Sequence, residues 1–267
     1  MEKGRGDTTA YETSGWGIGG GAEIKTGVGN FGASVAYYWG RNRDTETANQ
    51  VTANTYEVAG FWRLKRGGLR ATTRGSIAFV NLDGARRFEG TNGTDKISLT
   101  ANADRSARLY TAMSTVSYDM TSGSALSLRP VLSVDYYRLK EKGYTETGGG
   151  DAFNLAVRSR TSDELAVTAS GVVGLNFGGE DQWSGWSRIE LEGGRREIVS
   201  GNLGATVAQF KDGNAFTLLP DERESGWIGR VRGVAGNSGF QIGGEVGAEQ
   251  FQGNWALSLR ASLRVGL

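Results

Sequence analysis

The chain has 267 residues, of which 43 are glycine, 2 are proline and 38% are hydrophobic, so one large all-β domain fits it at least as well as two smaller domains. Its 30 Lys and Arg nearly balance its 29 Asp and Glu, and no overall field draws it to nucleic acid or to an anionic surface. Cysteine and histidine are absent, which excludes disulfides, thiolate metal sites and the side chain that most often serves as general base or metal ligand.

The chain contains eleven segments in which apolar and polar residues alternate, the pattern of a strand with one apolar and one polar face. The first two segments are "WGIGGGAEI" at 16–24 and "FGASVAYYWG" at 31–40. The others lie at about 55–65, 69–81, 109–119, 125–138, 164–177, 186–196, 226–235, 239–249 and 254–266. A spanning helix is excluded, because no window approaches about 18 consecutive apolar residues, but a spanning barrel is not.

The connections between these segments alternate between short and long, up to the last hairpin at 250–253, which is again short. The short ones are Gly-rich turns suited to hairpins, at 27–30, 66–68, 121–124, 178–184 and 236–238. The long ones are polar, at 43–53, 82–106, 139–162 and 197–224. This alternation predicts a transmembrane, up-and-down antiparallel β-barrel with tight turns at one rim and loops at the other. We therefore expect the long loops to share a rim, opposite Leu267 and the short turns.

The two faces of the strands differ in character. The apolar face carries aliphatic residues, with Trp and Tyr towards the strand ends, as in the aromatic girdles of membrane proteins. The polar face carries charges of both signs in the middle of strands, which would pair across a hydrated lumen. The charged residues expected in the lumen are Glu23, Glu57, Arg63, Arg70, Arg74, Arg129, Asp135, Arg188, Glu190, Glu192, Arg196, Arg230, Arg232, Glu245, Glu249, Arg260 and Arg264.

The last segment, "NWALSLRASLRVGL", separates the apolar and the polar face most clearly. Its Leu, Val and Trp side is expected to face lipid, and its Arg and Ser side to face the lumen. A soluble β-sandwich binding module is the alternative, because a shared core and a charged outer face produce the same period of two.

Motifs that resemble chemical sites have simpler interpretations. "GWGIGGGA" at 15–22 mimics a dinucleotide fingerprint, but its glycines alternate within a strand and a further strand follows. Glu190 and Glu192 share a face in the manner of a glycosidase pair, but Arg188 and Arg196 on that face favour an ion-pair network. There is no G-x-S-x-G elbow. The sequence therefore predicts no catalytic residue, metal or cofactor.

The run "LRPVLSVDYYRLKEKGYTETGGGDAFNLAVRSRTSDELAV" at 128–167, the "GGRR" at 193–196 and the C-terminal alternation resemble the β-domain of autotransporters, particularly the alphaproteobacterial kind, over about residues 11–267. The resemblance implies a twelve-stranded barrel of the bacterial outer membrane that follows a secreted passenger and holds a linker helix in its lumen. The implied partners are outer-membrane lipid, the passenger with its linker helix, and the barrel-assembly machinery. The resemblance also implies a terminal assembly signal at Leu259, Leu263, Val265 and Leu267.

The chain departs from this family pattern in two ways. Eleven strands are found instead of twelve, and bacterial single-chain barrels have even strand numbers. We therefore expect residues 1–12 to be the remnant of a loop after a missing first strand, and residues 13–267 to be the barrel domain. The strand at about 13–26 should then have an unpaired edge or close directly onto the last strand. The chain also ends in Leu267, where the family usually has an aromatic residue.

Two further outer-membrane alternatives remain. A porin-like channel would need a loop folded into the lumen, and the segments 82–106 and 197–224 are long enough for that. An outer-membrane protease or phospholipase would need a catalytic histidine, which this chain lacks.

Overall fold

The computed structural model describes residues 11–44, 46–120, 125–178, 185–237, 239–251 and 254–265. Eleven strands form one large antiparallel sheet. They are β1 (Tyr11–Thr26), β2 (Gly29–Asp44), β3 (Gln50–Arg66), β4 (Leu69–Asn92), β5 (Asp95–Tyr118), β6 (Leu126–Glu141), β9 (Arg160–Gly178), β10 (Trp186–Asn202), β13 (Gly226–Gly236), β14 (Phe240–Phe251) and β15 (Asn254–Val265). Among the described residues there is no helix of the length and hydropathy that a membrane span requires.

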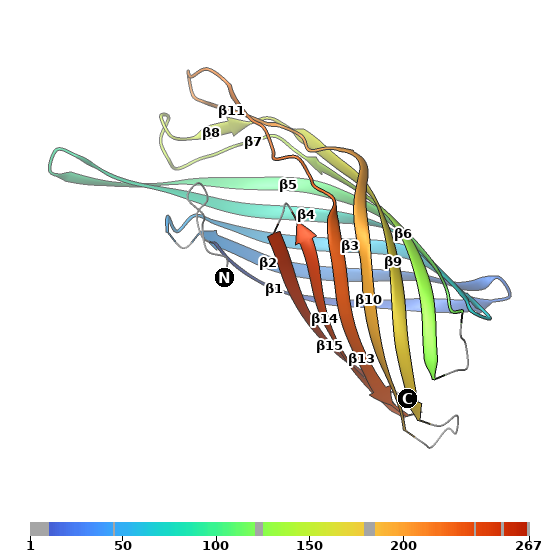
Figure 1. Ribbon diagram of the computed structural model, residues 1–267. Coiled ribbons are helices and arrows are strands. Elements are labelled where there is room, and N and C mark those ends of the chain that lie inside the picture. Colours follow the sequence, from blue (N-terminus) through green and yellow to red (C-terminus); the bar gives the residue numbers. More distant parts are fainter. Residues whose placement is uncertain are drawn as a thin grey trace.

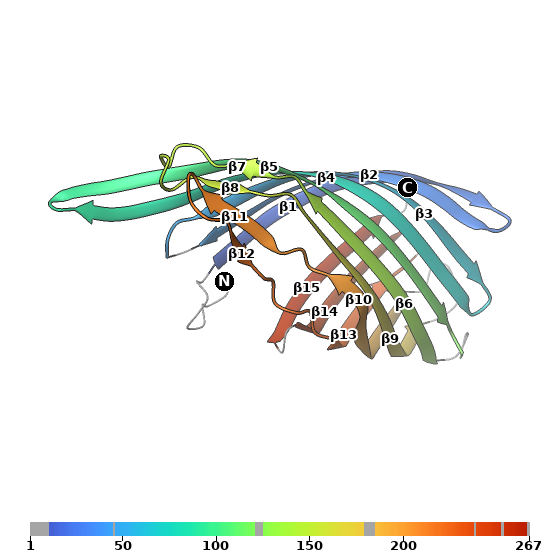
Figure 2. The ribbon, with the colours of Figure 1, turned by 90° about the horizontal axis from the view of Figure 1, so that it is seen from above.

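The order of the strands in the sheet follows the order in the chain, so the prediction of an all-β, up-and-down antiparallel architecture is confirmed. Figures 1 and 2 show that the sheet curls strongly, so that β13, β14 and β15 turn beneath β1 to β5. The sandwich alternative is wrong, because the eleven strands form a single continuous sheet and not two sheets packed face to face.

The two edges of the sheet are β1 and β15, and no ladder joins them within the described residues. The sheet is thus open and does not close as an eleven-stranded ring. Residues 1–10 of the expected loop remnant lie outside the described residues. Tyr11 and Glu12 pair with Asp44 and Arg43 and so belong to β1, because both strands of this hairpin continue beyond the expected boundary.

The segment 82–106, expected as a long polar loop, is instead a continuation of β4 and β5. Their register runs without a break from Leu69↔Tyr118 to Asn92↔Asp95. The strands persist because each pairs the backbone groups of the other, and only Gly93 and Thr94 remain as the turn. Gly93 has a φ of 64°, the positive value that two-residue hairpin turns require. The expected loop 43–53 is shorter for the same reason, since β2 ends at Asp44 and β3 begins at Gln50.

The two remaining long connections build a small accessory sheet. It consists of β7 (Tyr144–Thr145), β8 (Leu155–Val157), β11 (Thr206–Phe210) and β12 (Phe216–Leu218), in the order β12-β11-β8-β7. A bridge between Asn102 and Thr147 ties it to β5. In Figure 1 this sheet and the tip of the β4–β5 hairpin lie at the rim opposite the end of β15, as the meander predicts. Leu267 itself lies outside the described residues.

Candidate functional site: the inner face of the sheet

The register of the strands assigns every side chain to one of two faces, because directly opposed residues in an antiparallel ladder point to the same side. One face of β10, β13, β14 and β15 is identified by three directly opposed pairs, Glu190↔Arg232, Arg232↔Glu245 and Glu245↔Arg260. The ladders extend this face, called the inner face below, through all eleven strands. The charged residues on it include Glu23, Glu57, Arg63, Arg70, Arg74, Arg129, Asp135, Arg188, Glu190, Glu192, Arg196, Arg230, Arg232, Glu245, Glu249, Arg260 and Arg264.

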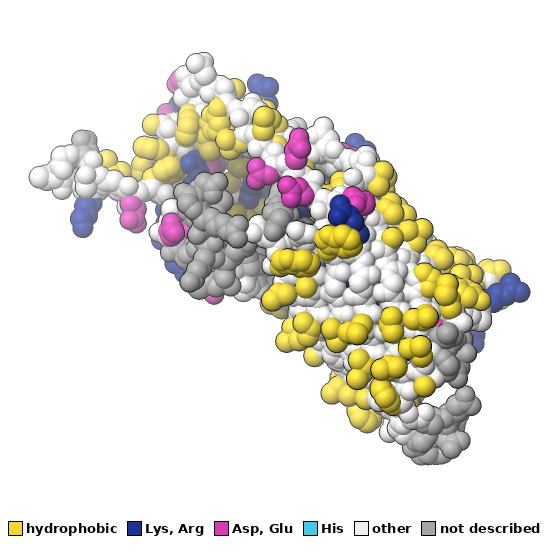
Figure 3. Space-filling model, in the orientation of Figure 1, with side chains coloured by type: hydrophobic (Ala, Val, Ile, Leu, Met, Phe, Trp, Pro, Cys, Tyr) yellow, Lys and Arg dark blue, Asp and Glu magenta, His cyan; other side chains and the backbone are white. Residues whose placement is uncertain are grey.

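The opposite, outward face carries large apolar side chains that no other described part of the chain covers. On β15, Leu259 is 81% exposed, Leu263 69% and Val265 61%. Figure 3 shows hydrophobic side chains gathered over this side of β13, β14 and β15. In water such a contiguous apolar surface would be a liability. The arrangement therefore fits a protein whose outward face meets hydrocarbon.

The buried residues lie on the inner side and are small. Among the described residues, all buried apolar side chains except Ala208 of β11 lie on the inner face. Most are alanine: Ala59, Ala78, Ala101, Ala103, Ala107, Ala166, Val172 and Ile228. A soluble domain buries its large apolar side chains, whereas this sheet exposes them. The polarity of the molecule is thus inverted relative to a soluble domain.

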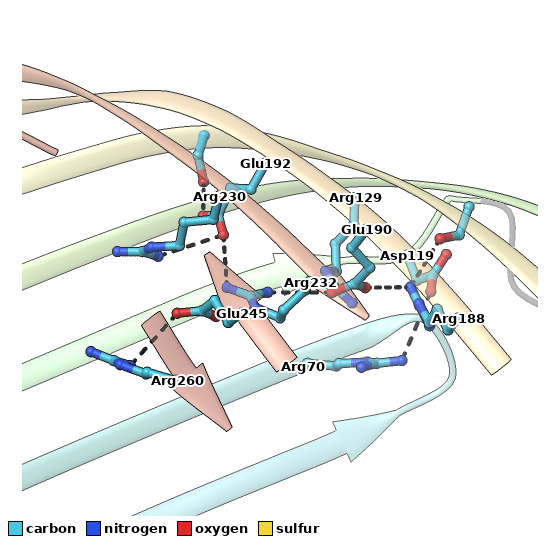
Figure 4. A network of polar contacts seen from close by, with 12 residues as sticks. Arg70, Asp119, Arg129, Arg188, Glu190, Glu192, Arg230, Arg232, Glu245 and Arg260 are labelled. Carbon is cyan, nitrogen blue, oxygen red and sulfur yellow. Dashed lines mark hydrogen bonds and ion pairs between the residues drawn. The ribbon is translucent and has the colours of Figure 1, made fainter. Parts of the chain in front are cut away.

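The centre of the inner face is an ion-pair network around Glu190. This carboxylate accepts hydrogen bonds from Arg129 at 2.8 Å and from Arg232 at 3.3 Å, and forms an ion pair with Arg188 at 2.8 Å. The side chains of Glu190 and Arg129 are both only 10% exposed. Figure 4 shows the arginines converging on Glu190 from three strands. A charge this deeply buried is tolerable only when opposite charges surround it.

A second carboxylate, Glu192, extends the network along β10. It accepts hydrogen bonds from Arg232 at 2.9 Å, Arg230 at 3.5 Å and the Ser170 hydroxyl at 2.9 Å. Arg232 also donates to Glu245, which forms an ion pair with Arg260 at 3.8 Å. Arg232 of β13 thereby links three carboxylates on β10 and β14, the two strands that flank it. The geometry does not support a glycosidase-like role for Glu190 and Glu192, because both carboxylates form ion pairs with arginines.

Smaller ion pairs occupy the inner face of the earlier strands. Glu57 pairs with Arg74, and Glu23 with Arg63 at 3.1 Å. Arg70 lies 3.8 Å from Asp119, near the end of the sheet with the short turns. Within the described part of the chain, no ion pair forms to three of the charges expected in the lumen, which are Asp135, Glu249 and Arg264.

One buried carboxylate of this face was missed at the sequence level. Glu164 of β9 is 8% exposed and forms ion pairs with Arg196 at 2.6 Å and with Arg223 at 3.4 Å. Arg223 comes from the connection after β12, so this loop is tied to the inner wall. A cleft of about 600 Å³ lies there, lined in part by Tyr137, Glu164 and Pro220. Continuing the alternation by two residues from Ala166 would have placed Glu164 on the inner face. Arg223 could not be predicted in this way, because it lies in a connection where apolar and polar residues do not alternate.

The glycines that mimic a nucleotide loop lie in the middle of β1, in unbroken register with β2. Gly21 is an inner-face residue where a Cβ would lie 2.6 Å from the carbonyl oxygen of Ala33. At Gly17 a Cβ would lie 2.5 Å from the ring of Tyr38. These positions need glycine because the neighbouring strand approaches closely. The described residues hold no group of three or more acidic side chains that could bind a metal.

The chain is similar in sequence and in fold to known proteins. A family model described as autotransporter beta-domain matches residues 2–247. The translocator domain of the autotransporter NalP from Neisseria meningitidis has a similar structure, with a TM-score of 0.64, 12% identity, and coverage of 96% of this chain and 80% of that one. The transport unit of AIDA-I from Escherichia coli aligns with a TM-score of 0.44 and 13% identity over 96% of this chain and 84% of that one. No curated protein matches the chain.

Proposed function

The chain belongs to the autotransporter β-domain family, and from this premise we propose how the two faces of its sheet serve transport. The protein is a translocator barrel of the bacterial outer membrane and takes part in type V secretion. Domains of this family are transport units and not enzymes.

The barrel exports and anchors a passenger polypeptide joined to its N-terminal side, and its inner face holds the linker helix of that passenger. The observation that carries this proposal is the division of the sheet, with charges on the inner face and uncovered apolar side chains on the outward face. A polar wall gives a hydrated path through the bilayer and partners for a linker. The network around Glu190 keeps that wall rigid, because Arg129, Arg188 and Arg232 hold the carboxylate from three strands.

The outward face contacts outer-membrane lipid, and the last strand, β15, carries the signal read by the barrel-assembly machinery. Leu259, Leu263 and Val265 lie together on the outward face of β15 and are exposed, which supports this assignment. Leu267, the fourth residue of the proposed signal, lies outside the described residues. The alphaproteobacterial type is proposed on the resemblance of the run at 128–167.

The test uses the natural full-length protein with an epitope in its passenger, expressed in a Gram-negative host. We expect protease added to intact cells to remove the epitope while the β-domain stays heat-modifiable on gels. An epitope that stays protected behind a folded barrel would contradict the proposal. Conductance of the purified domain tests the porin-like alternative, since a general porin would show a permanently open channel.

A further inference from the structure

The outward apolar surface of β4, β5 and β6 ends at a defined height. On β6 the outward residues from Leu126 to Tyr136 are apolar or aromatic, and the next two outward residues are Arg138 and Lys140. Leu126 and Tyr136 are ten positions apart, about 34 Å along a strand. At the usual tilt this corresponds to an apolar band about 25 Å tall, the height found in outer-membrane barrels. Arg138 and Lys140 therefore lie at the level of the lipid headgroups, on the loop side.

A third cation joins them on the neighbouring strand. Arg108 of β5 lies directly opposite Lys140 in the ladder, and all three cationic side chains are exposed. Opposed residues of this kind have Cβ atoms about 5 Å apart, and like charges at that position repel. The pair Arg108 and Lys140 therefore favours an anion between the two side chains.

The protein supplies no such anion within its described residues. None of Arg108, Arg138 and Lys140 forms an ion pair there, in contrast to the arginines around Glu190. Asp163 is the cross-strand neighbour of Arg138, again without an ion pair. The opposed acids Asp83 and Asp104 lie four positions further along the hairpin, about 13 Å from Phe79 and Arg108.

Aromatic rings hold two of these cations against the wall of the sheet. The guanidinium carbon of Arg108 lies 5.8 Å from the ring centroid of Phe79, and the Lys140 ammonium lies 5.6 Å from that of Tyr110. Both rings belong to the outward face, at the end of the apolar band on the loop side. Contacts of this length are cation–π interactions, and they keep the charges at the interface.

We propose that Arg108 and Lys140, flanked by Arg138, bind the phosphate of an anionic lipid headgroup in the leaflet on the loop side. A guanidinium donates two parallel hydrogen bonds to a phosphate, and an ammonium adds a point charge. The occupant is a lipid and not a free anion, because the cations sit directly above an apolar wall that only acyl chains can cover. This inference rests on the membrane placement proposed above.

The experiment measures lipid retention by the full chain, folded in neutral phosphocholine nanodiscs and extracted in mild detergent. The probes are bisphosphorylated lipid A, the same glycolipid without its phosphates, and inorganic phosphate, and native mass spectrometry counts the bound molecules. We expect retention of lipid A alone. Arg108→Gln with Lys140→Gln should weaken this binding about 30-fold, since each cation near an anionic lipid surface contributes about a factor of 5.4.

The matched control is Arg87→Gln with Lys96→Gln, which removes the same charge from the part of the β4–β5 hairpin beyond the membrane. Its lipid A affinity should stay within about twofold of the unmodified chain. Equal retention of the dephosphorylated glycolipid, full occupancy by inorganic phosphate, or unchanged binding by the double variant would overturn the inference. The comparison of lipid A with the dephosphorylated glycolipid uses the unmodified chain, so it tests the inference even if the double variant does not fold. Failure of that chain to enter neutral bilayers would instead count against the proposed function.

Discussion

Leu259 and Ser258 are consecutive residues of β15 at nearly the same depth but on opposite faces. Leu259 is 81% exposed on the outward face, opposite Val246. Ser258 is on the inner face opposite Gly247, between the diagonal neighbours Glu245 and Glu249. An arginine at either position changes the charge by the same amount, so the pair isolates the effect of the surrounding medium.

Leu259→Arg should lower the free energy of unfolding by about 2 to 4 kcal/mol, the cost of arginine on the lipid face near the bilayer midplane. The equilibrium between folded and unfolded chains then falls about 30- to 900-fold. Ser258→Arg should cost less than about 1 kcal/mol, because the inner face is hydrated and two carboxylates lie beside the new cation.

The assay is equilibrium unfolding by urea in lipid vesicles, followed by tryptophan fluorescence and checked by heat-modifiable mobility on gels. The unmodified chain is the reference for both variants. Equal losses for Leu259→Arg and Ser258→Arg would refute the assignment of a lipid face. A larger loss for Ser258→Arg would mean that the faces are reversed.

Three further predictions use the same unfolding assay or limited proteolysis. Glu190→Gln should lower the free energy of unfolding by about 3 to 5 kcal/mol, because it leaves Arg129 and Arg188 without their counter-charge, whereas Glu23→Gln, in a more exposed pair, should cost about 1 kcal/mol or less; similar losses would contradict the central role of Glu190. Gly21→Ala should cost about 1 to 3 kcal/mol, because its Cβ would meet the Ala33 carbonyl, while Gly20→Ala, with no atom within 4 Å, should not destabilise the sheet. Arg223→Gln should speed proteolysis between β12 and β13 by releasing the loop from Glu164, and an unchanged cleavage rate would show that this ion pair does not hold the loop.

Much of the sheet follows from local patterns in the sequence. The period of two in "NWALSLRASLRVGL" separates Leu259 and Leu263 from Arg260 and Ser262 without any knowledge of the neighbouring strand. The alternation of short and long connections likewise predicts the meander, because each tight turn pairs a strand with the next one in the chain. Glu164 was missed only because the expected strand began at that residue.

Other features depend on contacts between residues far apart in the chain. The convergence of Arg129, Arg188 and Arg232 on Glu190 depends on the register of β6, β9, β10 and β13, and a shift of one residue would move each side chain to the other face. The polar composition of 82–106 indicated a loop, yet β4 and β5 continue through it because each strand satisfies the backbone of the other. The accessory sheet joins two connections that are distant in sequence. Local periodicity therefore determined the strands of the large sheet and their two faces, and the connection lengths determined their order. The register, the extended β4–β5 hairpin and the ion-pair partners were decided by tertiary structure. Backbone pairing and charge neutralisation each require a partner from elsewhere in the chain.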